Sequence, residues 1–413
     1  MCHPLSMVEP RSEDVDVTGV AAGGEGVGRL GDGRAVFVRG ALPGERVRVA
    51  VAEERSRFAR AALTDVLDPA PGRVAPPCDR VAAGCGGCDW QHVAPRLQRE
   101  LKARIVTDAL RRIGRLDPPE PSLGPDLPVE GWRTTVRALV DDEGRPGFRL
   151  HHAHDPLAVG PGGCLVAHPL VDEVLREGRF PRPVREITVR AGARTGERLV
   201  VCAPATGDSR VPEGVTLVGA DDLDAGHRAW IHEVVAGRRW RISAGSFFQS
   251  RPDGAEVLVE TVVSALGGAP PGAGPVVDLY SGVGLFAGVL GQRTGGRVVA
   301  VESNRSAVAD ARINLADLDG ARVVRADVRR WRPSPASVAV ADPSRQGLGT
   351  DVVARIGATG AAALALVSCD PGALGRDAGL LAAAGWRLDS VRLIDLFPHT
   401  AHVEVVTGWF RGI

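Results

Sequence analysis

Short apolar runs alternate with amphipathic stretches through the last third of the chain, a pattern typical of strands and helices that follow one another. The expected strands are 276–280, 298–302, 322–325, 337–341 and 362–368, with a final pair near 391–395 and 402–408. The expected helices are 253–266, 285–292, 305–318, 350–358 and 372–384. This alternation predicts a doubly wound α/β sheet in a domain that covers residues 241–413.

The first part of the chain has a different pattern. Residues 11–70 hold short strand candidates separated by glycine turns, which predict a small β-barrel; the candidates are 15–17, 35–38, 46–51 and 61–67. We expect residues 1–10 to be disordered. Prolines between residues 69 and 77 mark a linker. A central α+β domain follows over 71–240, with an amphipathic helix near 97–113 and strand candidates at 136–140, 187–189, 199–202 and 216–219.

Composition narrows the class of protein. The 413 residues include 50 basic and 50 acidic side chains, so a nucleic-acid surface must be local. Two segments are locally basic, 29–60 and 96–115, and both are candidates for phosphate contacts. No apolar run approaches a membrane span, and the start, at Met1 or Met7, does not resemble a signal peptide. We expect a cytoplasmic monomer with no membrane partner.

A glycine-bearing turn follows the strand that ends at Tyr280. Gly282 and Gly284 lie in this turn, where the lack of a side chain lets the backbone approach a ligand closely. The next strand ends in Glu302, an acid placed to hold a pair of ribose hydroxyls. The spacing departs from the G-x-G-x-x-G dinucleotide pattern, which favours S-adenosylmethionine over a nicotinamide cofactor.

Three cysteines stand close together in a glycine-rich segment, Cys78-x6-Cys85-x2-Cys88. Cys164, which follows Pro161-Gly162-Gly163, is the best candidate for a fourth ligand. Four thiolates accept either tetrahedral zinc or a [4Fe–4S] cluster. Seven cysteines in a chain without an export signal favour metal ligands or nucleophiles over disulfides.

Polar motifs follow the later strands of the predicted sheet. Asp342 follows one strand, Cys369 follows the next in Ser368-Cys369-Asp370-Pro371, and Glu404 precedes the last. Because ligands gather at the carboxyl ends of such strands, we expect these groups to converge beside the glycine turn. A helix begins after Cys369, and its N-terminus should favour the thiolate. Cys369 is therefore a candidate nucleophile.

Five motifs together resemble the RNA 5-methyluridine methyltransferases: Phe247-Phe248-Gln249, Asp278-Leu279-Tyr280-Ser281-Gly282-Val283-Gly284, Asp342-Pro343-Ser344-Arg345-Gln346-Gly347, Ser368-Cys369-Asp370-Pro371 and Phe397-Pro398-His399-Thr400-Ala401-His402-Val403-Glu404. The resemblance covers nearly the whole chain. It implies a Rossmann-like methyltransferase domain, a TRAM barrel at the N-terminus and an RNA partner, with 23S rRNA favoured over tRNA.

The same resemblance implies roles for individual residues. Cys369 would be the nucleophile and Glu404 the base. The S-adenosylmethionine pocket would be lined by Gln249, Tyr280, Glu302 and Asp342, with Asp327 nearby, and the [4Fe–4S] ligands would be Cys78, Cys85, Cys88 and Cys164, with zinc as the alternative. Two positions depart from the family pattern: Leu285 stands where Asn is frequent, and Ser344 replaces a proline.

The chemistry agrees with these residue types. A thiolate that adds to carbon 6 of uracil makes carbon 5 nucleophilic, and a base must later remove the carbon-5 proton. Ser344 stands where 5-methylcytidine enzymes carry a second cysteine, which favours uracil. The alternatives from other classes are a non-catalytic RNA-binding or ribosome assembly factor, against which Cys369 and Glu404 weigh, and an iron–sulfur redox protein, which leaves the glycine turn unexplained.

Overall fold

The computed structural model describes the whole chain except residues 1–10, 152, 154, 268–273 and 412–413, so the disorder predicted for residues 1–10 lies outside the described residues. The described chain forms two compact units. The first comprises residues up to 77 together with 88–105 and 398–402. The second comprises residues 78–87, 106–397 and 403–413. No helix among the described residues is long and apolar enough to cross a membrane.

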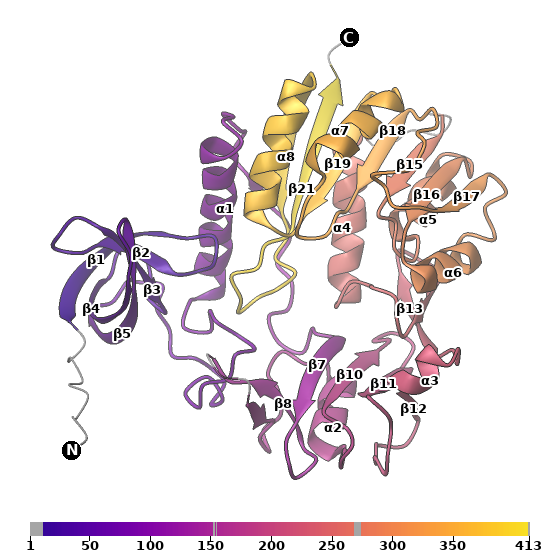
Figure 1. The fold of residues 1–413 in the computed structure, drawn as a ribbon. Coiled ribbons are helices and arrows are strands. Elements are labelled where there is room, and N and C mark those ends of the chain that lie inside the picture. The colour runs from indigo at the N-terminus through magenta and orange to yellow at the C-terminus, as the bar shows by residue number, and fades with distance from the viewer. Residues whose placement is uncertain (1–10, 152, 154, 268–273, 412–413) are drawn as a thin grey trace, which may run out of the picture. The chain divides into compact units, whose positions relative to one another are not determined.

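The first unit contains a closed five-stranded barrel (Figure 1). Its strands follow the order β1-β2-β3-β5-β4, with bounds β1 Ser12–Val20, β2 Gly26–Arg29, β3 Ala35–Arg39, β4 Arg46–Glu54 and β5 Phe58–Asp68. Alternate residues of these strands point inward, and Val36, Val38, Val47 and Val49 are fully buried. Four of the five strands coincide with predicted ones. The sequence analysis missed β2, whose two glycines carry no apolar pattern.

A second cluster of the first unit lies around Trp90. The indole packs with Leu42, Leu101 and Ala401, and its Nε1–H donates to the carbonyl of Gly24 at 3.0 Å. This cluster includes the first turns of α1 (Pro95–Arg112), where the buried Gln98 accepts a hydrogen bond from the backbone N–H of His399 at 2.7 Å. The segment 398–402, which shortly precedes Glu404, is therefore held by residues of the first unit.

The second unit is built on an eight-stranded sheet of order β17-β16-β15-β18-β19-β21-β20-β6. The strands β15 to β19 are parallel, and β21 runs antiparallel to β19. The bounds are β6 Ser122–Leu123, β15 Val276–Leu279, β16 Val298–Glu302, β17 Ala321–Arg325, β18 Val338–Ala341, β19 Ala363–Ser368, β20 Trp386–Leu393 and β21 Val405–Arg411. The doubly wound α/β fold predicted for this region is confirmed.

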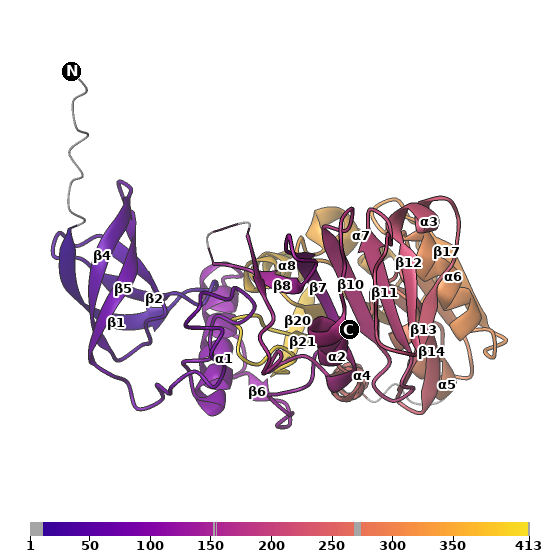
Figure 2. The same ribbon diagram turned by 90° about the horizontal axis from the view of Figure 1, so that it is seen from below.

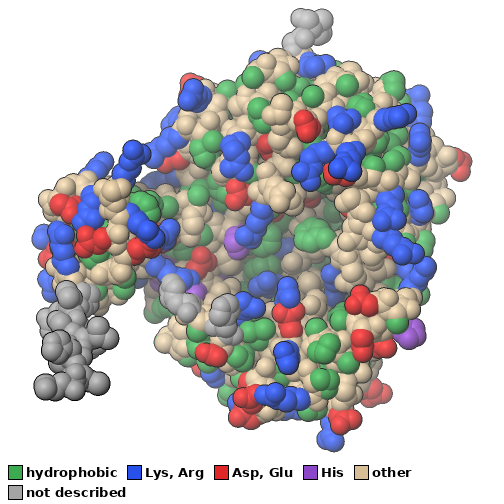
Figure 3. All heavy atoms as spheres, in the orientation of Figure 1, with side chains coloured by type: hydrophobic (Ala, Val, Ile, Leu, Met, Phe, Trp, Pro, Cys, Tyr) green, Lys and Arg blue, Asp and Glu red, His purple; other side chains and the backbone are tan. Residues whose placement is uncertain are grey.

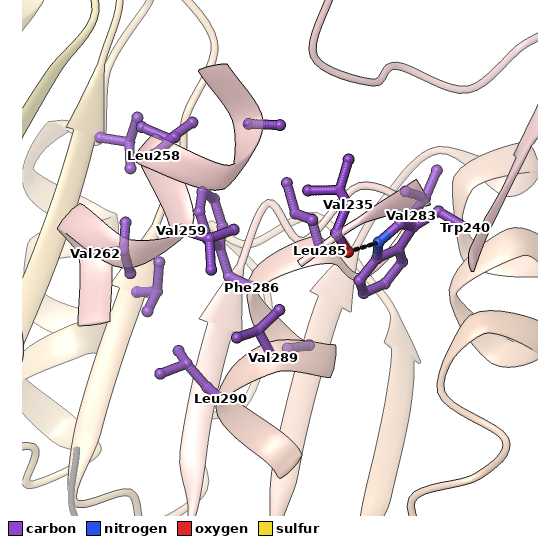
Figure 4. Packing of buried hydrophobic residues seen from close by; sticks show 14 of the residues in the cluster. Val235, Trp240, Leu258, Val259, Val262, Val283, Leu285, Phe286, Val289 and Leu290 are labelled. Atoms are coloured by element: carbon purple, nitrogen blue, oxygen red, sulfur yellow. Dashed lines mark hydrogen bonds between the residues drawn. The ribbon is translucent and has the colours of Figure 1, made fainter. Parts of the chain in front are cut away.

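Helices cover both faces of this sheet (Figure 1). Helices α4, α5 and α6 pack on one face, and α7 and α8 pack on the other. The bounds are α4 Pro252–Ala265, α5 Leu285–Arg293, α6 Arg305–Asn314, α7 Gly349–Ala358 and α8 Pro371–Ala383. Figure 4 shows how Leu258 and Val262 of α4 and Phe286 and Val289 of α5 form one apolar layer. Because both faces are covered, β15, β18 and β19 are buried at every residue, which explains their continuous apolar runs.

A six-stranded sheet of order β12-β11-β10-β7-β8-β9 makes up most of the central region (Figure 2). The bounds are β7 Thr135–Val140, β8 Pro146–Arg149, β9 Pro156–Ala158, β10 Glu186–Ala191, β11 Arg198–Ala203 and β12 Val215–Gly219, with helices α2 Pro169–Glu177 and α3 Ala220–Asp224. A hairpin of β13 Trp230–Val235 and β14 Arg238–Ser243 follows. The α+β class is confirmed, although β8, β9, α2, α3 and the hairpin were not predicted.

The hairpin is attached to α6 by a buried carboxylate. Asp310 has no solvent exposure and accepts hydrogen bonds from the backbone N–H and hydroxyl of Ser243, at 2.8 and 2.7 Å, and from the hydroxyl of Ser246, at 2.6 Å. The guanidinium of Arg241 lies 3.2 Å away. Trp240 of the same hairpin packs on α5, and its Nε1–H donates to the carbonyl of Val235 (Figure 4).

We predict that Asp310→Ala destabilises the second unit, because removing a buried carboxylate leaves its donors and Arg241 without their acceptor. The expected loss is about 3–5 kcal/mol in the free energy of unfolding, measured by chemical denaturation. Asp317→Ala serves as the matched control: it removes the partner of Arg238 from the more exposed end of the same region, with an expected loss of about 1 kcal/mol or less. Equal losses in the two variants would contradict the prediction.

Candidate active site

A pocket opens at the carboxyl ends of the parallel strands of the second unit. It is lined by residues of the Phe-Phe-Gln segment, the glycine turn and the end of β18: Phe247, Phe248, Gln249, Tyr280, Ser281, Gly282, Val283, Leu285, Phe286 and Asp342. Four of the seven residues predicted for the cofactor therefore line one pocket. The departure Leu285 also lines it, with an apolar side chain where a polar one was the family expectation.

The turn after β15 has the backbone that a closely bound ligand needs. Tyr280 and Gly282 have positive φ values of 62° and 54°, and a Cβ at Gly282 would meet nothing within 4 Å. Gly284, the second glycine predicted for the turn, has φ 93° and forms the N-cap of α5. The hydroxyl of Ser281 is buried and has no hydrogen-bond partner among the described residues. The turn therefore offers a ligand both space and a free polar group.

Glu302 lies directly beside this turn. One carboxylate oxygen accepts a hydrogen bond from the N–H of Gly282 at 3.0 Å, and the other accepts from the N–H groups of Ser303 and Asn304, both at 2.6 Å. These bonds fix the carboxylate at the end of β16, the position expected for an acid that accepts from ribose hydroxyls. Asp327 is exposed shortly after β17, and its charge contributes to a raised pKa of Tyr280. Burial raises the pKa of Tyr280 to about 12.

Cys369 and Glu404 lie at the ends of neighbouring strands, β19 and β21. The carboxyl of Glu404 is buried, and burial together with the charge of Asp342 raises its pKa well above its usual value. Asp342 keeps some exposed surface where it lines the pocket, yet enough protein surrounds it that burial raises its pKa to about 7. Burial therefore makes ionisation of both acids less favourable than it is in water.

The expectation that the helix N-terminus favours the Cys369 thiolate is wrong for this structure. Burial raises the pKa of the thiol to about 11, and the charges of Glu404 and Asp342 contribute to the rise, while Arg345 acts in the opposite direction. The helix α8 does begin two residues later, but its cap is the carboxylate of Asp370, which accepts from the N–H of Ala373 at 2.7 Å. Desolvation and two carboxyls outweigh any dipole effect.

The sequence analysis missed Asp278 as a site residue. Its side chain is fully buried, one oxygen accepts from the N–H of Ala287 at 2.9 Å, and the other has no hydrogen-bond partner among the described residues. Burial raises its pKa well above the usual value, and the charges of Asp342 and Glu302 add to the effect. An acid inside an otherwise apolar strand was the signal that could have identified it.

Three of the four predicted metal ligands, Cys78, Cys85 and Cys164, belong to the second unit. Burial raises the pKa of Cys85 and of Cys164. The charge of Cys78 further raises the pKa of Cys85, and the charge of Cys85 further raises that of Cys164, so the three thiols are electrostatic neighbours. Cys88 is counted with the first unit. Within the described ranges, no three or more Cys, His, Asp or Glu side chains are grouped as metal ligands. The thiols thus suit a metal chemically.

We predict that Asp342→Asn changes how stability depends on pH. The folded-state pKa of about 7 lies above the ordinary value of 3.8, so this carboxyl stabilises the fold most below about pH 4, and that contribution is lost as the pH rises through 7. Asn cannot ionise, so the stability of the variant relative to the original protein should rise between pH 5 and 8, by up to about 3 kcal/mol. Thermal unfolding across this range measures the difference.

The control for this measurement is Asp351→Asn, which removes an exposed carboxyl from the first turn of α7. The difference in melting temperature between this variant and the original protein should not rise between pH 5 and 8. A flat difference for Asp342→Asn would contradict the burial of an uncompensated charge at the pocket.

Comparison with known proteins places this site in a family. Residues 11–64 match the TRAM domain family. Uncharacterized RNA methyltransferases of Streptomyces coelicolor and Corynebacterium efficiens are 39% and 35% identical to the chain; the matches cover 98% and 96% of it and 93% and 94% of those proteins. The 23S rRNA (uracil(1939)-C(5))-methyltransferase RlmD of Alkalilimnicola ehrlichii is 32% identical, over 96% of each protein.

Among solved structures, the tRNA (uracil-54, C5)-methyltransferase of Pyrococcus abyssi, in complex with S-adenosyl-L-homocysteine, superposes with a TM-score of 0.73. It covers 96% of this chain and 100% of its own, at 23% identity, a likeness that shows the fold. The relatives of higher identity, which match over nearly their full length, show more: the chain carries a TRAM domain and belongs to the family of RNA methyltransferases.

Proposed function

We propose that this protein methylates carbon 5 of a uridine in RNA, with S-adenosylmethionine as the methyl donor. The observation that carries the proposal is the grouping of a thiol, Cys369, with the carboxyls of Glu404 and Asp342 at strand ends, where Asp342 also lines the pocket. Transfer of a methyl group to an unactivated ring carbon requires a nucleophile and a base, which this combination offers.

The pocket fits the methyl donor. Glu302 would accept from the ribose hydroxyls, the unpartnered hydroxyl of Ser281 and the open space at Gly282 would admit the rest of the ligand closely, and Gln249 and Tyr280 would flank it. The donor supplies an electrophilic methyl group on a cationic sulfonium. A positive charge next to the acid cluster also suits Asp342, whose ionised form is otherwise disfavoured there.

The residues of the chain would then act in sequence. Cys369 would lose its proton to solvent, and its sulfur would add to carbon 6 of the uracil, which gives an enolate. Carbon 5 of this enolate would take the methyl group as the methyl–sulfur bond of the donor breaks. Glu404, as the carboxylate, removes the proton from carbon 5. The electron pair of that C–H bond re-forms the C5–C6 double bond, and the C6–S bond breaks. Because the resting pKa of Cys369 is about 11, the thiolate must form after ligands have changed the site, for example through the cationic sulfonium.

The substrate we propose is 23S rRNA, in the cytoplasm. The support is the RlmD relative, which is named for uracil methylation in 23S rRNA and matches 96% of the chain, while the tRNA enzyme among the solved structures supports only the fold. Mapping of 5-methyluridine in 23S rRNA and tRNA from a deletion strain tests this choice. A methylated uridine that disappears from tRNA alone would overturn it.

We also propose that Cys78, Cys85, Cys88 and Cys164 ligate a [4Fe–4S] cluster that stabilises the surrounding fold, with zinc as the alternative. The support is their spacing in the sequence and the mutual influence of three of the thiols. The backbone around them is well anchored: the N–H of Gly86 donates to the carbonyl of Arg149 at 2.8 Å, and the N–H of Cys164 donates to Asp172 at 2.7 Å.

Protein purified without exposure to air should contain iron and sulfide in a ratio near one to one. Cys85→Ser should lose the iron, whereas Cys202→Ser, which changes a buried cysteine of β11, should retain it. Elemental analysis and the visible absorption spectrum provide the readout. Stoichiometric zinc without iron would reject the cluster in favour of the alternative, and retention of iron by Cys85→Ser would reject this ligand set.

The central prediction separates the two reacting groups. Cys369→Ala should abolish methylation and any covalent complex with RNA, because no sulfur remains to add to carbon 6. Glu404→Gln should still form the adduct and transfer the methyl group, but the carbon-5 proton should remain, so methylated RNA stays bound to Cys369. A denaturing gel with labelled RNA, followed by mass spectrometry of the cross-linked peptide, reports both outcomes.

Cys202→Ala is the control for removal of a thiol elsewhere, and it should behave as the original protein does. If Glu404→Gln turned over normally, or if the adduct mapped to another cysteine, the assignment of the two roles would be wrong.

A further inference from the structure

The edge of the eight-stranded sheet carries a concentration of arginines that the proposed chemistry does not use. Among the described strands, β17 is the outermost one and pairs only with β16. Between residues 321 and 332 there are five arginines, Arg322, Arg325, Arg329, Arg330 and Arg332, and a single acid, Asp327. All five are exposed. Since the whole chain carries equal numbers of basic and acidic residues, this excess is local.

Three of these arginines surround a hollow on one face of the edge. Arg322, Arg330 and Arg332 line it together with Val299, Val324, Ala326, Trp331 and Ser334. We call these three residues the edge arginines. None of them has an ion pair or hydrogen bond with a described acidic side chain, whereas Arg329 lies 3.5 Å from Asp327. In Figure 3, blue side chains line the edge of the second unit where β17 lies in Figure 1.

The hollow lies on the sheet face opposite α4, α5 and α6. Val299 pairs in register with Arg322, so both point to the same face, as does Val324 two residues on. Their neighbours Ala300 and Val323 point to the other face, where they pack into the core beneath those helices. The face that bears Arg322 is thus covered here by the segment after β17 and not by a helix, and the sheet edge stays accessible.

The segment that carries Arg330 and Arg332 is held firmly. Trp331 between them is buried, and its carbonyl accepts a hydrogen bond from Arg355 of α7 at 2.6 Å; the same guanidinium donates to the carbonyl of Arg329. The backbone at the edge arginines is therefore pre-organised, which lowers the entropic cost of binding. An apolar floor with three convergent cations and an exposed strand edge is a surface for a polyanion.

We infer that the edge arginines bind phosphates of the RNA substrate at a position outside the reacting pocket. The inference rests on membership in the RNA methyltransferase family, and it concerns docking of RNA, not methyl transfer. Arginine suits the role because its planar guanidinium binds phosphate oxygens in pairs. The competing explanation is that charges on an edge strand only prevent pairing with other strands, and this explanation predicts no effect on RNA affinity.

The arginines of the barrel support the choice of the edge arginines as the RNA-binding residues, because five of the barrel arginines are paired with acids. Between residues 29 and 60, five arginines are committed to acids of the barrel: Arg34, Arg46, Arg48, Arg55 and Arg60. Two of the acids, Asp14 and Glu25, lie outside the basic segment 29–60. The barrel face is consequently less cationic than its arginine content predicts, and the edge arginines have no such partners among the described acids.

The test measures RNA affinity against salt concentration, without methyl donor, so that it does not depend on catalysis. The probe is a labelled stem-loop transcript of about 40 nucleotides with uridines in its loop. The triple variant Arg322→Gln, Arg330→Gln, Arg332→Gln should bind at least tenfold more weakly at low salt. The slope of log affinity against log salt should become shallower by about 2, because each phosphate that the variant no longer neutralises accounts for roughly 0.7–0.9 of the slope.

Two further variants make the result specific. The control triple Arg228→Gln, Arg297→Gln, Arg312→Gln removes the same charge from exposed positions elsewhere in the second unit and should leave the slope unchanged. A triple Arg→Lys variant at the edge preserves the charge and should retain most of the slope, which also guards against a failure of the Gln variant to fold. An unchanged slope for the edge Gln triple, or an equal change in both Gln triples, would overturn the inference. If the edge Gln triple bound polyglutamate more weakly while its RNA affinity stayed intact, the inference would be overturned in favour of an acidic protein partner.

Discussion

Carboxyl groups crowded at the carboxyl ends of parallel strands dominate the physics of this protein. Asp278, Asp342 and Glu404 are all close enough to protein atoms that burial raises their pKa values, and the charges of neighbouring acids add to the effect in Asp278 and Glu404. Such a group cannot ionise fully at neutral pH without a cation nearby. The topology enforces this crowding, because the carboxyl ends of the parallel strands and the amino end of the antiparallel strand β21 lie at the same edge of the sheet.

The same crowding explains why the thiol of Cys369 rests in its neutral form. Burial and two neighbouring acids raise its pKa to about 11, and Arg345 offsets only part of this. A resting thiol is protected from oxidation and from adventitious alkylation, since the thiolate is the reactive form. A cationic ligand then changes the balance for all the groups together, because one positive charge favours ionised Asp342 and thiolate Cys369 alike.

How far the sequence predicted this structure depended on burial. Strands buried on both faces, such as β15 and β19, show as continuous apolar runs and were predicted almost to their bounds. The start of β20 was missed because Arg387, Asp389 and their neighbours alternate in exposure and dilute the apolar signal. The positions of Tyr280, Gly282 and Asp342 around one pocket followed from motif and topology. The raised pKa of Cys369 could not be predicted in this way. It depends on desolvation by the atoms packed around the sulfur, which spacing along the chain does not specify.

Arginine content was an equally incomplete guide to where RNA binds. In the barrel, antiparallel pairing places acids across from arginines; Asp14 on β1 is paired with Arg48 on β4, so a basic segment becomes a nearly neutral surface. At the sheet edge β17 has no outer neighbour among the described strands, and so no strand beside it to supply such acids. Phosphate contacts of the kind inferred for this edge would fix the position of an RNA without carrying sequence information. Under the proposed function, selection of the base would come from the strand ends around Cys369, so the edge would contribute affinity and the strand ends specificity.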